Sequence, residues 1–316
     1  MNKLRFIGLV TLLGSGTAMA AVDPGLLNLV MPDATVLSGV QVDRTLASPF
    51  GQYILSKMQP QAFQKLAAAT GFDPTHDLQQ ILAATSAASP AKGNGLVLGR
   101  GNFQPAQILS TATAAGAAIT TYHGVQVIGS PKNPDGAVAF LNPTTVAMGS
   151  TSLVEGAIDR NAAGATYSGP LASAAQTASA NSAWFVTLTP LSQFLGGKTS
   201  NPQIDNLSQN NLFQSVTGAS GGLNFSPSNV TITADATTTS AQNAQALADV
   251  LKFFVGMIQN NAGNGPGGQQ FAALASAATF TANGPVAHIS LAVSEQQAEQ
   301  LFAQTNAMHA AASVQH

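Results

Sequence analysis

The hydrophobic positions of this chain fall into short runs that alternate with small or polar residues. Runs of this kind occupy residues 36–42, 94–103 and 184–188, and they are rich in Val, Leu and Phe. Alternation with a period of two residues is typical of β-strands that bury one face. The pattern therefore predicts a sheet whose strands come from both halves of the chain.

Several of the predicted strands come in pairs that are joined by turn residues. Asn142-Pro143 separates two apolar runs, and Asn283-Gly284 does the same near the end of the chain. Such dipeptides between β-rich runs predict hairpins. Further hairpins are expected around His123-Gly124 and across residues 226–229. Neighbouring strands should therefore be mostly antiparallel.

Other segments follow the helical period. Residues 61–70, 74–82 and 241–259 have apolar positions three or four residues apart, which predicts helices. A further helix is expected to begin near Pro105, because proline favours the first helical position.

The helix expected at 241–259 is apolar on most of its surface. Leu247, Leu251 and Phe254 mark one stripe, and Phe253 and Met257 widen it. A helix of this kind is usually buried in a core. The alternative is contact with an apolar ligand or a membrane surface. Phe254 and Met257 are therefore candidate ligand-binding residues.

Similar signals recur at an offset of 141 residues. Pro49 and Pro190, each preceded by Ser or Thr, both predict a helix start, and the turns at Asn142 and Asn283 have the same separation of 141. Each of these hairpins then runs into a predicted helix.

Capping boxes are expected at the starts of those two helices. Ser152 with Glu155 forms the first, and Ser294 with Gln297 forms the second. We therefore predict an α+β fold of two related halves, each an antiparallel sheet with helices packed on it, produced by tandem duplication. One continuous α+β domain with coincidental local similarity is the alternative.

The chain is expected to begin with a secretory leader. Lys3 and Arg5 precede an apolar run at 6–13, and Ala18-Met19-Ala20 follows. A charged start, a short apolar centre and an A-x-A end are the parts of a signal peptide, and the run is too short to span a bilayer. We expect an exported protein, periplasmic or secreted, with no transmembrane segment in the mature chain. The predicted division is a signal peptide at 1–20, a first repeat at 21–161, an Ala/Ser/Gly-rich connector at 162–181, a second repeat at 182–308 and a frayed tail at 309–316.

Composition narrows the chemistry. Only 8% of the residues are charged, and removing Lys3 and Arg5 from the 11 basic residues leaves nine against 13 acidic ones. Nucleic-acid binding needs clustered Lys and Arg, so it is not expected. The chain has no cysteine, which excludes disulfides and thiolate catalysis. Stability must therefore come from packing.

One segment matches a hydrolase motif in its letters. Gly218-Ala219-Ser220-Gly221-Gly222 reads as G-x-S-x-G, which works where a strand enters a sharp turn and a helix leaves it. Here β-rich segments follow Ser220, and the candidate bases His288 and His123 lie in predicted strands without an evident orienting acid. We interpret this segment as a glycine-rich turn and expect no catalytic residue.

Asp73, His76 and Asp77 share one side of a predicted helix. Such a cluster can hold a hard metal ion. Helix capping explains the same residues, because Asp73 precedes Pro74 and Asp77 lies near the positive end of the helix dipole. We therefore expect neither a metal site nor a cofactor.

Arg100 is the third candidate ligand-binding residue. It has the same strand parity as Leu96 and Leu98, so its side chain should lie on an apolar face of the sheet. An arginine in that position needs a carboxylate or carbonyl partner. It could bind an anionic ligand, and a structural ion pair is the alternative.

Three segments together resemble exported bacterial proteins that are classed as domains of unknown function. They are residues 36–52, Gly71-Phe72-Asp73-Pro74, and the hairpin and helix at 137–160. The chain departs from many such proteins because its helices are poor in Lys and Glu. The resemblance implies no catalytic residues.

These patterns predict an exported, non-enzymatic binding or interaction protein. Its partner would be another protein or a small apolar or neutral ligand, bound between sheet and helices or at the junction of the halves. The alternative is a hydrolase that acts outside the cytoplasm on polysaccharide, peptide or ester, with Ser220 as its motif-level candidate.

Overall fold

The computed structural model describes residues 21–57, 60–86, 95–129, 135–190, 211–261, 274 and 276–303. The first half contributes strands β1 (Val36–Gln41), β2 (Leu78–Thr85), β3 (Gly95–Gly101), β4 (Ile119–Tyr122), β5 (Val125–Gly129), β6 (Gly136–Asn142) and β7 (Thr145–Ser150). The second half contributes β8 (Ala183–Thr187), β9 (Val216–Phe225), β10 (Asn229–Thr238), β11 (Ala278–Asn283) and β12 (Val286–Ser294).

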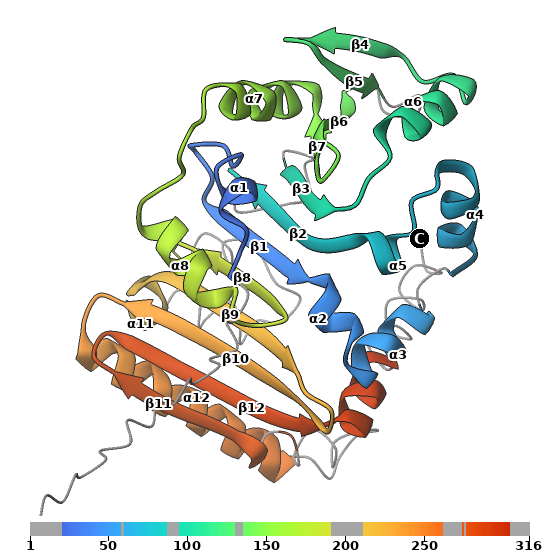
Figure 1. Cartoon of the computed structure of the whole chain (residues 1–316). Helices are drawn as coiled ribbons and strands as arrows, with labels where there is room; N and C mark the ends of the chain where they lie inside the picture. Colours follow the sequence, from blue (N-terminus) through green and yellow to red (C-terminus); the bar gives the residue numbers. More distant parts are fainter. Residues whose placement is uncertain are drawn as a thin grey trace, which may run out of the picture.

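The described helices lie on both faces of these strands (Figure 1). They are α1 (Pro24–Leu27), α2 (Val42–Leu46), α3 (Pro49–Lys57), α4 (Pro60–Thr70), α5 (Pro74–Asp77), α6 (Pro105–Ala114), α7 (Thr151–Ala162), α8 (Pro170–Ala178), α11 (Asn211–Gln214) and α12 (Ala241–Asn261). Residues 295–303 are also helical. Of the helices that the structure describes, none is both long and apolar enough to cross a membrane.

All the described strands join in one sheet of twelve, in the order β11-β12-β10-β9-β8-β1-β2-β3-β7-β6-β5-β4. Neighbouring strands are antiparallel throughout. The prediction of an α+β fold with an antiparallel sheet is therefore confirmed. Strands from the first and second parts of the sequence share that sheet, because β8 pairs directly with β1.

The seam between β1 and β8 depends on a large side chain that lies over a glycine. Trp184 on β8 pairs with Gly39 on β1 and with Gly222 on β9. A Cβ atom at Gly39 would lie 2.6 Å from a carbon of the Trp184 ring, so the strands leave no room for a side chain there. Trp184 itself is only 5% exposed. The absence of a side chain at Gly39 is thus required for the two halves to pair.

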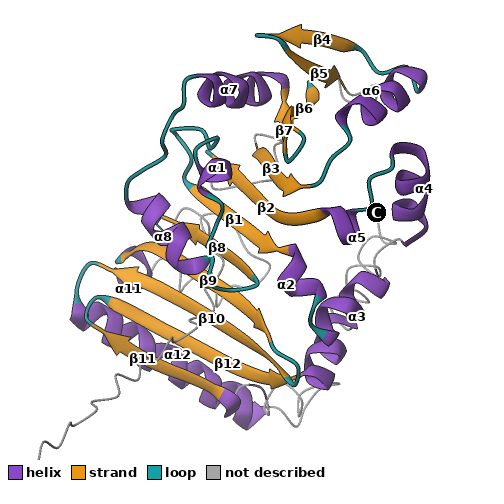
Figure 2. Ribbon diagram, in the orientation of Figure 1, coloured by secondary structure: helices purple, strands orange, loops and turns teal. Residues whose placement is uncertain are grey.

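One face of the sheet, which we call the packed face, is tightly filled. Helix α8 lies in front of β8 and β9 in Figure 2, and α1 and α7 cover the first half. Under them, the sheet residues Leu37, Leu82, Leu96 and Leu98 have no exposed surface and Val186 has 1%. Complete burial of a leucine stabilises a fold by about 1.5–3 kcal/mol, so this layer supplies much of the stability.

The opposite face carries α12 and the helices α2 to α6. Helix α12 lies behind β10, β11 and β12 (Figure 1), where Ala244 and Leu247 pack against Ala287. The expected long helix is therefore present, and one face of its N-terminal half is buried through Ala244, Leu247 and Ala248. We call this side of the sheet the hollow face, because its centre contains the cavities described below.

The local sequence signals have mixed outcomes. The predicted hairpins at Asn142 and Asn283 are confirmed, as is the one at His123, where the backbone takes a φ of 45°. The Ser294–Gln297 capping box is also confirmed, since Ser294 N–H donates to Gln297 Oε1 at 2.9 Å. The box at Ser152 is wrong, because α7 begins at Thr151 and its N-cap is Ser150.

The helix predicted at 74–82 is also wrong beyond its first turn. Helix α5 ends at Asp77, and Leu78 begins strand β2. The spacing of Leu78, Ile81 and Leu82 suits a helix, but the segment pairs with β1 on one side and β3 on the other. Tertiary pairing therefore overrides the local period.

The connector predicted at 162–181 has internal structure. It contains α8, whose Leu171, Ala172 and Ala175 are buried in the packed face. An Ala- and Ser-rich composition here makes a close-packed helix, because small side chains let α8 approach the sheet.

Gly39→Ala should destabilise the fold by about 1–3 kcal/mol, since the added methyl overlaps the Trp184 ring and overpacks a closed site. Urea unfolding followed by tryptophan fluorescence measures the loss, because the chain has one tryptophan. Gly95→Ala is the matched control: its Cβ would lie 3.5 Å from a methyl of Thr85, an ordinary contact. An equal loss in both variants would contradict the role of the seam.

Candidate functional site

Three adjoining cavities lie between the hollow face and the helices that cover it. The inner cavity has a volume of about 530 Å³. Its floor is a row of four side chains on neighbouring strands, Ile81, Val40, Ala183 and Leu223, which the strand register places opposite one another. The rest of its lining comes from helices α2 to α5 and the end of β9: Val42, Thr45, Leu46, Gly51, Ile54, Leu55, Phe63, Pro74, Thr75, Leu78 and Phe225.

Helix α3 forms one wall of the inner cavity because it packs unusually close to α2. The hydroxyl of Ser48 accepts a hydrogen bond from Gly51 N–H at 3.0 Å and so caps α3. A Cβ atom at Gly51 would overlap the carbonyl oxygen of Thr45. Glycine is therefore required at this contact, and the predicted helix start at Ser48-Pro49 is confirmed.

The lateral cavity continues from the inner one along the first half of the sheet. It has a volume of about 220 Å³ and shares Leu78 and Ile81 with the inner cavity. Its aromatic wall is a series of ring contacts, Phe72 to Phe103 at 5.2 Å and Phe103 to Phe140 at 5.4 Å. Apart from Thr70, every side chain that lines it is apolar or glycine.

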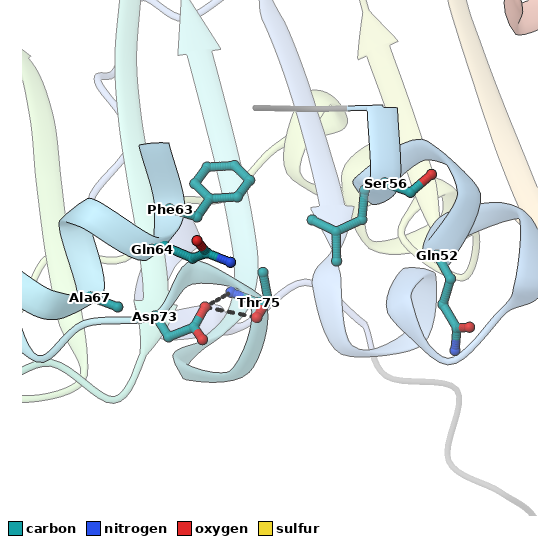
Figure 3. A pocket seen from close by; sticks show the side chains of 8 residues that line it. Gln52, Ser56, Phe63, Gln64, Ala67, Asp73 and Thr75 are labelled. Carbon is teal, nitrogen blue, oxygen red and sulfur yellow. Dashed lines mark hydrogen bonds between the residues drawn. The ribbon is translucent and has the colours of Figure 1, made fainter. Parts of the chain in front are cut away.

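The outer cavity, about 480 Å³, lies between α3 and α4 with α5 (Figure 3). It shares Leu55, Phe63 and Thr75 with the inner cavity. Its other lining residues are Gln52, Ser56, Gln64, Ala67 and Asp73. The outer cavity is therefore more polar than the inner one.

The wall of the inner cavity contains a buried hydroxyl that has no hydrogen-bond partner among the described residues. Thr45 lines the inner cavity, but its Oγ1 has almost no accessible surface and makes no hydrogen bond within the part of the chain that the structure describes. An unpaired buried hydroxyl costs about 1–3 kcal/mol of desolvation. The surface that the inner cavity presents is therefore apolar, and the Thr75 hydroxyl at its edge donates to Asp73 at 2.7 Å.

Asp73, His76 and Asp77 form the predicted capping arrangement. Asp73 Oδ1 accepts from Thr75 N–H at 2.9 Å, and Asp77 Oδ2 accepts from Asp73 N–H at 2.7 Å. The hydrogen bond from the Thr75 hydroxyl, above all, lowers the pKa of Asp73. Across the described ranges, no group of three or more His, Cys, Asp or Glu side chains could hold a metal ion.

The three predicted ligand-binding residues lie outside these cavities or outside the described side chains. Arg100 is on the packed face, where its Nε lies 3.3 Å from Asp23 Oδ2 and its Nη1 donates to Thr145 Oγ1 at 3.4 Å. Met257 is on α12 with its side chain 38% exposed, and it does not line any of the three cavities. Phe254 belongs to the same helix, but its side chain lies outside the described part. A ligand role for these residues stays a prediction.

Ser220 does not lie in a turn, so that interpretation was wrong. It is in the middle of β9, where Gly221 and Gly222 make room for the side chains of Phe185 and Asn181. Glycines here serve strand packing, because a Cβ at either position would overlap its neighbour.

The acid that the sequence left unidentified is Asp235, on the adjoining strand β10. Its carboxylate lies between Ser220 and His288: Ser220 Oγ donates to Oδ2 at 3.5 Å, and His288 Nδ1 lies 2.5 Å from Oδ1. A serine nucleophile needs the imidazole between hydroxyl and carboxylate. Here the Asp235 carboxylate lies between the Ser220 hydroxyl and the His288 imidazole, so these three residues cannot activate Ser220 by that mechanism. His123, the other candidate base, pairs with Asp159 at 3.0 Å.

No family model matches this chain, and no curated protein matches it. Solved structures, however, do match this chain. The chain is similar to crystal form III of TP0453, with a TM-score of 0.53 and 15% identity over 90% of this chain and 99% of that one. Crystal form IV of TP0453 gives a TM-score of 0.52 at 15% identity, over 91% of this chain and 99% of that one. At this identity the similarity concerns the fold, and it extends over nearly the whole of both chains.

Sequence reasoning missed the residues of the inner cavity. Val40, Ala183 and Leu223 are ordinary strand residues in sequence, and only the order of the strands brings them together. Thr45 and Gly51 flank the helix start predicted at Ser48-Pro49, and this position in the sequence could have indicated that they lie close together.

Thr45→Val should leave stability unchanged or raise it by about 1 kcal/mol, because a methyl replaces a buried hydroxyl that lacks a partner. The free energy of unfolding in urea measures this. Thr187→Val is the matched control: its hydroxyl donates to Thr35 O and accepts from Thr189 N–H, both at 3.0 Å, so it should lose about 1–3 kcal/mol. A clear loss in Thr45→Val would mean that its hydroxyl has a partner.

Proposed function

We propose that this chain is an exported, non-enzymatic binding protein whose ligand is apolar or neutral and occupies the inner cavity. One observation carries this proposal, the contrast between the two faces of the same sheet. On the packed face Leu37 and Leu82 are completely buried, whereas on the hollow face their strand neighbours Val40 and Ile81 line a cavity. A sheet that served only as a scaffold would be expected to fill both sides.

The lining favours an apolar guest over water. A buried water needs two to four polar partners, and the surface of the inner cavity is apolar. An apolar ligand instead gains about 25 cal/mol for each Å² that it removes from water. The inner and outer volumes of about 530 and 480 Å³ fall in the usual range for small-molecule sites.

Tandem duplication is part of the same proposal. Read outward from the seam, the first half has the order β1-β2-β3-β7-β6-β5-β4 and the second half β8-β9-β10-β12-β11. The first five positions correspond, with a helix after the third strand in each series, whereas β5 and β4 have no counterpart among the described strands of the second half. This correspondence supports duplication, and it makes the inner cavity a site at the junction of two related units.

A protein partner and a hydrolase remain the rival proposals. The hydrolase has the weaker support, because the Ser220, Asp235 and His288 row places its acid where a base is needed. No observation on the described residues favours it over binding.

Ala183→Phe should abolish binding of an apolar guest, because the ring enters the inner cavity from its floor. The probe is the neutral dye N-phenylnaphthylamine, and binding is measured by energy transfer from Trp184. We expect at least a tenfold loss of affinity with unchanged or higher thermal stability, since filling a cavity adds contacts.

Ala292→Phe is the control for that variant. Ala292 lies on β12 with an exposed side chain, and it does not line the cavities. It should leave dye binding unchanged. Failure of the unaltered protein to bind the dye, or equal binding by Ala183→Phe, would overturn the proposed site.

Export is supported by the leader pattern at 1–20. When the full chain is expressed in a bacterial host, intact mass should show a mature form that begins at Ala21 in the periplasm or medium. Such cleavage leaves Val22 in the fold, where it is 2% exposed and its N–H donates to Ser179 Oγ at 2.9 Å. A full-length chain that stays in the cytoplasm would contradict export.

A further inference from the structure

We propose that the ligand is a neutral amphiphile, with its apolar chain in the inner cavity and an uncharged, hydrogen-bonding head group in the outer cavity. This inference rests on the proposed function. It is carried by the way the two cavities join and by the difference in polarity between them.

The outer cavity adjoins the inner cavity on the side where the lining is exposed to solvent. Leu55, Phe63 and Thr75 line both, so the two cavities adjoin at these side chains. None of the inner lining is exposed, whereas Gln52, Ser56 and Gln64 of the outer lining are. A long ligand can therefore be covered at one end and meet solvent at the other, between α3 and α4 (Figure 3).

The polar groups of the outer cavity suit a neutral head group. Gln52 and Gln64 present carboxamides, which both donate and accept hydrogen bonds, and Ser56 adds a hydroxyl. Hydroxyls and amides on a ligand have the same dual character. Such pairs need no countercharge, and the residues that line either cavity include no Lys or Arg.

A fixed negative charge selects against anionic head groups. Asp73 lines the outer cavity between Gln64 and Thr75 (Figure 3), and its Oδ1 accepts from Thr75 N–H and Thr75 Oγ1. These hydrogen bonds favour the charged form, in keeping with the lowered pKa of this carboxyl. Asp77 adds a second carboxylate, hydrogen-bonded to the Asp73 backbone. His76, whose Nδ1 lies 3.0 Å from Asp73 Oδ2, points into solvent with its side chain 80% exposed.

The basic residues on the flanking helices do not offset this charge at the cavity. Lys57 ends α3 with its Nζ over the Tyr53 ring, 5.2 Å from the centroid, and Lys65 on α4 is exposed. Neither lines the outer cavity. An anionic head group placed there would therefore meet Asp73 without a compensating cation in the lining.

The test compares two ligands that share one chain. Monolaurin has a neutral glycerol head group, and laurate is an anion at pH 8. Each displaces N-phenylnaphthylamine from the mature protein, residues 21 onward, at concentrations below micelle formation. We expect monolaurin to displace the dye at a concentration at least about tenfold lower than laurate, which follows from a like charge within a few ångströms of the head group.

Asp73→Asn isolates the cause. Asparagine is as good an N-cap as aspartate, so α5 keeps its hydrogen bond from Thr75 N–H while the charge is removed. The preference for monolaurin should shrink by about three- to tenfold. Asp249→Asn removes a charge from α12, where Asp249 pairs with Lys252, and should leave the preference unchanged.

The outcomes separate this inference from the function on which it rests. If the dye itself fails to bind, the proposed function falls and the inference falls with it. If the dye binds but laurate competes as well as monolaurin, or if Asp73→Asn changes the preference no more than Asp249→Asn does, the binding function stands and the neutral-amphiphile inference is wrong.

Discussion

The contact of Trp184 with Gly39 holds the architecture together. It lies at the seam where β8 pairs with β1, and a second glycine, Gly222, lies opposite Trp184 on β9. The indole over Gly39 fixes the register of β1 against β8, since a shift would bring a side chain against the ring. That register in turn aligns Ala183 with Val40 and Leu223 on the other face. The floor of the inner cavity is therefore a consequence of packing on the opposite side.

Dense packing on one face allows loose packing on the other. A protein without disulfides depends on its core, and here the completely buried leucines of β1, β2 and β3 all point to the packed face. Burial of several such side chains is worth on the order of 10 kcal/mol before the entropy cost, which is comparable with the whole stability of a domain. The hollow face can then keep half-buried residues such as Val40 and Ile81 around a cavity without loss of the fold.

Short sequence patterns correctly predicted those features of the fold that depend on residues close together in the chain. The Asn142 and Asn283 hairpins and the Ser294 cap depend on residues within a few positions of one another, and they were predicted correctly. Strand β2 was missed, because its helical spacing is overridden by partners 40 residues away in β1. The candidate site was missed for the same reason: its floor unites residues from four strands, and no short segment contains more than one of them.

Because the chain has few charged residues, the electrostatic effect of each one is less offset by its neighbours. The row of Ser220, Asp235 and His288 lies on the same side of the sheet as the packed face, on strands β9, β10 and β12. The chain presents Ser, Thr and this row there instead of alternating Lys and Glu. Only 8% of the residues are charged, so each charged side chain has few other charged side chains near it. In the proposed binding role, selectivity would depend mainly on shape and hydrogen bonds. The carboxylate of Asp73 beside the outer cavity would then act on a head group with little opposition from neighbouring cations. The low charge density, from which we expect no nucleic-acid binding, is thus also the property on which the proposed discrimination by one acidic residue depends.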